Sequence, residues 1–425
     1  MSATTSTYQF DNKLRLAVVE MPHMASTALG IWNGVGSRHE TDNQHGMAHF
    51  MEHLVFKGSP LRNAAVVSRE IEGLGASIDG FTVEDYVSYQ VKGPSECFPN
   101  LLEVLADIYR YPVLDPAEIE AERQVIGEEI AMVRDQPAQW LEDLLSEAVF
   151  GETHPLGRSI TGTHDSLSAM TRSDLTDFHR ASYSGGQTVI AVAGPIKSET
   201  IVEQVGLAFE GLSCGAPIPF KPATHLESLL RFEAEPSQEQ AHLALSFPSV
   251  DRHDPTRYAH KLLSVILGEN MSSRLFQIMR EKHALCYEIQ SDLMSFEDVG
   301  AFQIFLALSP DRLELALQVL GEILNQIASA PVSATELETA KRFIIGQSRI
   351  SLENTGAQVM WAGEGMITFG DWVEPEEIHA KLAAVTVEEI QAAAVEVLTR
   401  KAPCAALIGP EESHHILAGY LSATY

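Results

Sequence analysis

The sequence repeats part of its own pattern 215 residues further along, and this repetition constrains the fold more than any other feature. A helix start at Thr171–Leu175 is followed by an apolar stretch that ends in Gly194-Pro195. The same succession recurs at Thr386–Ile390 and ends in Gly409-Pro410. Each start has the form of a capping box, in which a Thr and an acidic side chain satisfy backbone donors in the first turn. The chain is therefore expected to contain two halves with the same fold.

Apolar periodicity indicates that each half mixes strands and helices. Alternating apolar residues at 14–18, and less regularly at 83–88, favour strands. Helical periodicity covers residues 96–109, 116–134, 311–328 and 334–353. We therefore expect an α+β fold in each half, with helices packed on one face of a sheet.

The length and one proline-rich segment predict the domain organisation. A chain of 425 residues is too long for a single hydrophobic core. Residues 215–222 read Gly-Ala-Pro-Ile-Pro-Phe-Lys-Pro, and such stretches are extended and semi-rigid. We expect an N-terminal domain at 1–214, a linker at 215–223 and a C-terminal domain at 224–425.

The run His49-Phe50-Met51-Glu52-His53 is the strongest chemical signal in the chain. It has the form H-x-x-E-H, which is an inverted zinc-peptidase helix motif. Positions four apart share one face of a helix, so both imidazoles can reach one metal ion. The neighbouring residues are mostly apolar, and ionisable groups on a buried helix are costly without a partner. A metal is the simplest partner, and Glu52 is then free to accept a proton from water.

Two His make an incomplete site, because catalytic zinc commonly takes three protein ligands. The acidic segment 115–130 is the best local source of the third. Asp115 and Pro116 predict a helix start there, with Glu118 in its first turn. Glu122 and Glu129 lie two turns apart on one face of that helix. The pattern alone does not choose among these carboxylates.

Taken together, these residues resemble the pitrilysin/insulinase superfamily of inverted zinc peptidases, in its short-chain branch related to the mitochondrial processing peptidase. In that family the third ligand is a Glu 76 residues after the second His, which is Glu129 here. A second Glu seven residues before the ligand matches Glu122. An Arg followed seven residues later by a Tyr helps to bind substrate in the family, and Arg280 and Tyr287 fit that pattern. The resemblance covers nearly the whole chain.

Two segments depart from the family pattern, and one of them is the turn Gly268-Glu269-Asn270, which stands where the family has a run of glycines. The strand that faces the substrate often carries an Asn-Ala pair, whereas Asp79-Gly80 stands in the matching stretch 75–82. We expect a peptide to add as an edge strand near 78–84, with Asp79 and Phe81 among the substrate-binding residues.

The repetition also indicates that only the first half holds a metal. Glu118-Ile119-Glu120 is echoed by Glu336-Leu337-Glu338, and at that offset Glu129 and Glu122 correspond to Gln347 and Ala340. No second H-x-x-E-H occurs.

The resemblance implies a zinc-dependent endopeptidase with one Zn²⁺ per chain, held by His49, His53 and Glu129. Glu52 would be the general base, and Glu122 would support the site. Two alternatives stay open: a non-catalytic scaffold, and a metal-binding subunit that cleaves only with a partner chain. Related enzymes form a closed chamber from paired chains. A homodimer is therefore expected first, and a heterodimer with an inactive paralogue second.

Composition narrows the partners. A net charge of −29 disfavours nucleic acid and anionic membranes, and would favour basic peptides if acidic groups line a cavity. No apolar run of 18 residues predicts a membrane span. The four scattered Cys fit reduced thiols. The first residues show neither a secretory signal nor an Arg-rich leader, so a cytoplasmic protein is expected.

Overall fold

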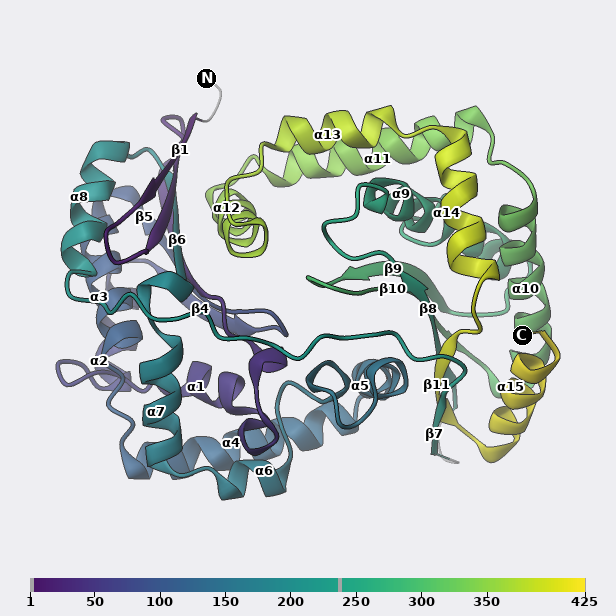
Figure 1. Ribbon diagram of the computed structural model, residues 1–425, viewed down its shortest axis with the longest axis horizontal. Coiled ribbons are helices and arrows are strands. Elements are labelled where there is room, and N and C mark those ends of the chain that lie inside the picture. The colour runs from purple at the N-terminus through teal and green to yellow at the C-terminus, as the bar shows by residue number, and fades with distance from the viewer. Residues whose placement is uncertain (1–3, 236–238, 425) are drawn as a thin grey trace. The chain divides into compact units, whose positions relative to one another are not determined.

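The computed structural model describes residues 4–235 and 239–424. The chain divides into two compact units, and most of their helices and strands are labelled in Figure 1. Unit 1 comprises Met1–Ala131, Ser159–Lys221 and Arg349–Glu374. Unit 2 comprises Met132–Arg158, Pro222–Ser348 and Pro375–Tyr425.

Unit 1 is built on a six-stranded sheet with the order β1-β2-β6-β3-β5-β4. Only the β2–β6 pair is parallel, so the sheet is mainly antiparallel. The strands are β1 (Thr4–Gln9), β2 (Arg15–Glu20), β3 (Ser26–Asn33), β4 (Ser77–Thr82), β5 (Val87–Pro94) and β6 (Thr188–Gly194). Among the described strands, β4 pairs with β5 alone, so β4 is an edge strand of this sheet.

Helices cover both faces of this sheet. Leu16, Ile31 and Tyr89 belong to the core on one face. That face carries α1 (Met47–Val55), α2 (Ala64–Gly73), α3 (Phe98–Arg110), α4 (Pro116–Arg134), α6 (His164–Ala169), α7 (Arg172–Ser182) and α8 (Ser198–Ala208). On the other face Trp32 and Val189 pack against a single helix, α12 (Thr355–Phe369). The sequence-based expectation of helices on one face is therefore incomplete.

Unit 2 has the same plan with five strands in the order β7-β11-β8-β10-β9. The strands are β7 (Leu230–Ala234), β8 (Ala241–Ser249), β9 (Glu288–Ser295), β10 (Gly300–Leu308) and β11 (Cys404–Gly409). Only the β7–β11 pair is parallel. Two homologous α+β halves with mainly antiparallel sheets are thus confirmed.

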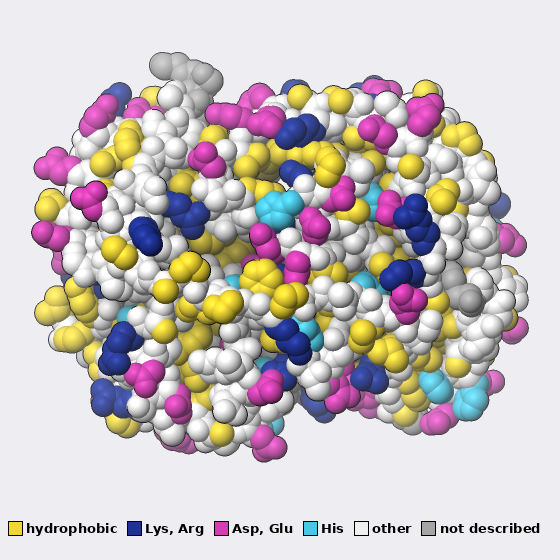
Figure 2. Space-filling view, viewed as in Figure 1, with side chains coloured by type: hydrophobic (Ala, Val, Ile, Leu, Met, Phe, Trp, Pro, Cys, Tyr) yellow, Lys and Arg dark blue, Asp and Glu magenta, His cyan; other side chains and the backbone are white. Residues whose placement is uncertain are grey.

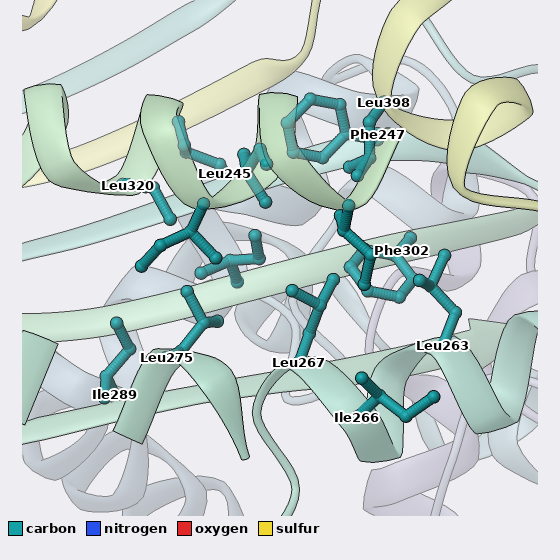
Figure 3. Packing of buried hydrophobic residues seen from close by; sticks show 14 of the residues in the cluster. Leu245, Phe247, Leu263, Ile266, Leu267, Leu275, Ile289, Phe302, Leu320 and Leu398 are labelled. Carbon is teal, nitrogen blue, oxygen red and sulfur yellow. The ribbon is translucent and has the colours of Figure 1, made fainter. Parts of the chain in front are cut away.

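Figure 3 shows part of the main core of unit 2. Leu245 and Phe247 from β8 and Phe302 from β10 pack there with Leu263 from α9 and Leu320 from α10. The helices on this face are α9 (Arg257–Leu267), α10 (Leu313–Ser329), α11 (Ala334–Ser351), α13 (Pro375–Ala384), α14 (Val387–Thr399) and α15 (Glu411–Thr424), with a π-helical turn, η6 (Phe276–Lys282). The other face is covered by α5 (Pro137–Phe150).

The units differ from the contiguous division into 1–214 and 224–425. Helix α5 precedes the linker in sequence but packs on β8 and β11 of unit 2. Helix α12 follows the linker but packs on β3 and β6 of unit 1. Each half of the sequence therefore supplies one helix to the unit formed mainly by the other half. A domain boundary at the linker assigns both α5 and α12 to the wrong unit.

Both predicted capping boxes are present. Thr171 N donates to Asp174 Oδ2 at 2.9 Å, and Asp174 N donates back to Thr171 Oγ1 at 3.3 Å. Thr386 and Glu389 make the same pair of bonds at the start of α14. Helix α4 begins at Pro116, where Asp115 Oδ1 accepts from Ala117 N at 2.8 Å.

The distribution of surface charge and the apolar content of the helices both concern the possible binding partners of the chain. Acidic side chains are scattered over the face shown in Figure 2 and are mixed with Lys and Arg. Among the described residues, none of the helices is both long enough and apolar enough to cross a bilayer.

Close packing of α12 on the sheet gives a stability prediction. A Cβ added at Gly363 of α12 would lie 2.3 Å from the ring of the fully buried Trp32, whereas one at Gly346 of α11 would meet nothing within 4 Å. Gly363→Ala should destabilise the protein by about 1–3 kcal/mol through overpacking. Gly346→Ala should stabilise it by about 0.5–1 kcal/mol, because Ala loses less backbone entropy in a helix.

Denaturation midpoints of the two variants should therefore move in opposite directions. A Gly363→Ala protein as stable as the wild type would show that α12 can shift away from Trp32 at no cost.

Candidate metal centre

Helix α1 is fixed at its first turn by a glycine and a buried carboxylate. Its N-cap, Gly46, has φ +90°, and a Cβ there would lie 2.8 Å from the Thr161 carbonyl oxygen, so no larger residue fits. The Glu40 carboxylate accepts hydrogen bonds from Gly46 N at 2.8 Å and Ala48 N at 2.7 Å. Glu40 thus satisfies donors that the helix leaves open and places a negative charge at its positive end.

The two imidazoles lie side by side on α1. Their ring centroids are 4.6 Å apart, as expected for positions one turn apart. All residues of α1 except His53 are buried. Burial and the neighbouring His53 lower the pKa of His49 to about 3, so its imidazole is neutral, which is the form that binds metals.

Helix α4 brings Glu129 to the same point. Glu129 Oε2 lies 3.7 Å from His49 Nε2 and 3.6 Å from His53 Nε2. Within residues 4–235 and 239–424 these are the His, Cys, Asp or Glu side chains that could together hold a metal, with ligand atoms within 4.8 Å of one another. The fold thus brings together the three residues that were predicted as metal ligands, His49, His53 and Glu129.

The trio suits zinc. Ligand atoms about 2.1 Å from a tetrahedral ion lie about 3.4 Å apart, close to the distances seen here. Two imidazole nitrogens and one carboxylate oxygen form a common catalytic zinc donor set that leaves a fourth position open. In addition, the buried His49 Nδ1 has no hydrogen-bond partner among the described residues, so that ring is held mainly by packing.

Glu122 supports the centre from α4 through His53. Its Oε2 lies 3.0 Å from His53 Nδ1, and its Oε1 lies 2.5 Å from Lys57 Nζ. A proton on Nδ1 satisfies this contact and leaves Nε2 free to face Glu129. A carboxylate on the far nitrogen of a metal-binding His fixes the ring and raises its basicity. Glu122 therefore contacts the candidate centre through His53 and is not one of the three side chains that could together hold a metal.

Glu52 is held beside the ligands by strand β4. Its Oε2 accepts a hydrogen bond from Thr82 Oγ1 at 3.0 Å. Burial is the main reason that the pKa of Glu52 is raised. A Cβ at Gly80 would lie 3.1 Å from Glu52 Oε1 and 2.8 Å from the Phe56 ring. The glycine that departs from the family pattern thus leaves room for the Glu52 carboxylate.

Strand β4 turns its predicted binding residues away from the centre. Gly80 lies towards Glu52, and Thr82 bonds to it, so strand alternation directs Asp79 and Phe81 to the opposite side. There Phe81 packs edge-on to Tyr86, at a centroid distance of 6.1 Å, beside the core under α12. Asp79 is exposed, and its Oδ1 accepts from Gly80 N. Neither side chain joins the metal ligands.

Arg280 and Tyr287 form a pair within unit 2. The Arg280 guanidinium lies 5.4 Å from the Tyr287 ring centroid and 4.7 Å from that of Phe276. Arg280 belongs to η6, and the Tyr287 side chain is 73% exposed just before β9. The two residues are thus together, with the tyrosine open to solvent.

Sequence reasoning missed three residues that hold the centre: Glu40, Lys57 and Thr82. Lys57 lies two residues after the end of α1 and pairs with Glu122. Its closeness in sequence to the H-x-x-E-H motif is the signal that could have identified it. Glu40 and Thr82 act through contacts that only the fold creates.

Two family models match the chain. The model for insulinase, peptidase family M16, matches residues 15–164. The model for the peptidase M16 inactive domain matches residues 169–344. Similar proteins include an uncharacterized zinc protease of Streptomyces coelicolor, 32% identical, with 93% of this chain and 88% of that one covered. An uncharacterized zinc protease of Bacillus subtilis is also 32% identical, with 92% and 95% covered.

Solved structures share the fold. A protease from Helicobacter pylori superposes with a TM-score of 0.90 at 20% identity, covering 96% of this chain and 100% of that one. A peptidase M16 inactive domain from Pseudomonas fluorescens gives 0.87 at 22% identity, covering 96% and 98%.

The contact between Glu122 and His53 gives a metal-binding prediction. Glu122→Gln should weaken zinc affinity about 10–100-fold, because the ring of His53 loses its charged partner. Competition against a chromophoric chelator measures this. Glu118→Gln is the matched control, since Glu118 is exposed on the same helix and the charge change is the same. Equal zinc affinities for both variants would contradict the role of Glu122.

Proposed function

Since this chain belongs to the insulinase family of peptidases, family M16, we propose that it is a zinc-dependent endopeptidase that hydrolyses peptides or short unfolded segments. The observation that carries the proposal is the convergence of His49, His53 and Glu129 with a buried Glu52 on the same helix. The relatives named as zinc proteases support the same chemistry.

Each residue has a distinct task in this proposal. His49, His53 and Glu129 would hold one zinc ion, which supplies Lewis-acid chemistry by polarising the scissile carbonyl and acidifying water. Glu52 accepts the proton of the attacking water and later delivers it to the leaving amine. Thr82 holds Glu52 through its hydroxyl. Glu122 and Lys57 keep His53 in the ligating orientation.

Strand β4 is the proposed docking edge for the substrate backbone. It is an edge strand of the unit 1 sheet, and Thr82 at its end bonds to Glu52. A peptide that pairs with an edge strand is bound through its main chain, which tolerates many sequences. Asp79, on the other side of β4, would then act on neighbouring substrate side chains and favour basic ones. We further propose that Arg280 and Tyr287 bind substrate, from the same chain or from a second copy.

A second candidate is a metal-binding subunit that cleaves only with a partner chain. It is favoured by one observation: residues 169–344 match a domain model named as inactive. We propose a homodimer as the working state and a heterodimer with an inactive paralogue as its alternative. Mass measurement of the purified chain in solution separates a dimer from a monomer that awaits a partner.

The decisive test uses the purified chain and an unstructured peptide library. We expect one zinc per chain and cleavage that a chelator abolishes. Glu52→Gln should keep zinc and lose about 10²–10⁴-fold in kcat, because the general base is removed while the ligands remain. Glu118→Gln, which removes an exposed carboxylate, should cleave like the wild type.

Different failures have different meanings. Full activity in Glu52→Gln would refute Glu52 as the base. Zinc without cleavage would favour the partner-dependent subunit. A chain that binds no zinc would refute both proposals.

A further inference from the structure

A bidentate ion pair joins two separate stretches of unit 2. Arg274 Nε donates to Glu336 Oε1 at 2.7 Å, and Arg274 Nη2 donates to Glu336 Oε2 at 2.8 Å. The side chains are 18% and 30% exposed, so the pair is partly shielded from water. Such a fork fixes the direction of both side chains, which a single contact between flexible residues does not do.

The position of Glu336 is fixed by the start of helix α11. It lies in the first turn of α11, where its backbone N donates to Ser333 Oγ at 3.1 Å. The next residue, Leu337, is buried in the main core of unit 2. A carboxylate here is also stabilised by the positive end of the helix.

Arg274 stands at the start of the helical segment that winds into η6. It is followed by Leu275, and both Leu275 and Met279 are fully buried. The segment is π-helical, as His283 N donates to Ile278 O at 3.1 Å. π-Helical turns are rare and redirect the side chains that they carry. The direction of Arg280 therefore depends on how this segment begins.

At the far end of the segment, Leu285 and Cys286 are buried in the main core of unit 2, whereas the Tyr287 side chain that follows them is exposed. The Arg280 guanidinium contacts the rings of both Phe276 and Tyr287. Ala284 has φ +48°, a left-handed conformation that is uncommon for a residue with a Cβ. Tyr287 is largely exposed, although its N donates to Ala307 O at 3.1 Å. A rotation at the start of the segment would move Arg280, which belongs to η6, and would change its contact with the Tyr287 ring.

The internal repeat shows that this ion pair is particular to unit 2. Glu336 corresponds to Glu118, which lies in the first turn of α4 in unit 1 and is exposed. In unit 1, which carries the candidate metal ligands, the side chain at this position, Glu118, is exposed to solvent. The unit that carries Arg280 and Tyr287 uses this position to bind an arginine.

We propose that Arg274 and Glu336 form a clamp that positions the segment 276–287 for substrate binding. The two residues act through Arg280 and Tyr287 and do not touch substrate themselves. This inference rests on the substrate-binding role proposed above for Arg280 and Tyr287.

The test compares the full-length wild-type chain with Glu336→Gln and Arg274→Lys. The first variant removes the charge of the acceptor, and the second keeps the cation but loses the fork. Glu377→Gln is the control, because it breaks an exposed ion pair with Lys381 on α13, also in unit 2. The readouts are amide hydrogen exchange over 276–287, zinc content, and affinity for a fluorescent unstructured peptide.

Both clamp variants should bind the peptide roughly tenfold more weakly, as expected for loss of a charged hydrogen bond. Amides in 276–287 should exchange faster, while zinc content stays at the wild-type level. The control should change neither property. Where the chain cleaves, KM should rise and kcat should stay within about twofold. The exchanged pair, Arg274→Glu with Glu336→Arg, should recover part of the protection and of the affinity.

Wild-type exchange or wild-type affinity in both clamp variants would overturn the inference, and so would an equal loss in the control. If the wild-type chain binds peptide but never cleaves, the proposed peptidase activity fails while exchange and affinity still decide the clamp. If exchange quickens but affinity holds, the clamp is structural only and the inference is refuted.

Discussion

The burial of α1 is the constraint on which the site depends. Every residue of this helix except His53 is buried, yet it carries three ionisable side chains. Each of them must be neutral or must find a partner, because an isolated buried charge is very costly. His49 is neutral, His53 faces Glu122, and Glu52 takes the Thr82 hydroxyl. The partners of His53 and Glu52 come from α4 and β4, so these two elements must lie close to α1.

The grouping of His49 and His53 on one helix face and the start of the neighbouring acidic helix could be predicted from sequence, because their signals are local. The spacing of His49 and His53 follows from the period of a helix, and the start of α4 follows from Asp115 and Pro116. The choice of Glu129 among several glutamates came from the resemblance to a family. Periodicity alone could not have made that choice, since Glu122 lies on the same face of α4.

What escaped prediction depends on contacts between distant parts of the chain. Glu40 caps α1 across a turn, and Thr82 reaches Glu52 from a strand edge, so neither leaves a pattern in the sequence. The exchange of α5 and α12 was equally invisible. Both helices are apolar enough to cover a sheet, and nothing in their sequences says which sheet they cover.

The exchange of helices also ties the formation of unit 1 to the synthesis of the chain. Its sheet is finished when β6 has been made, at residue 194, but Trp32 and its neighbours stay uncovered until α12 emerges near residue 369. During translation the growing chain must therefore carry an exposed apolar sheet face while most of unit 2 is being made. A fragment that ends at the linker would keep that face exposed permanently, which makes the first half a poor independent product and a natural client for chaperones.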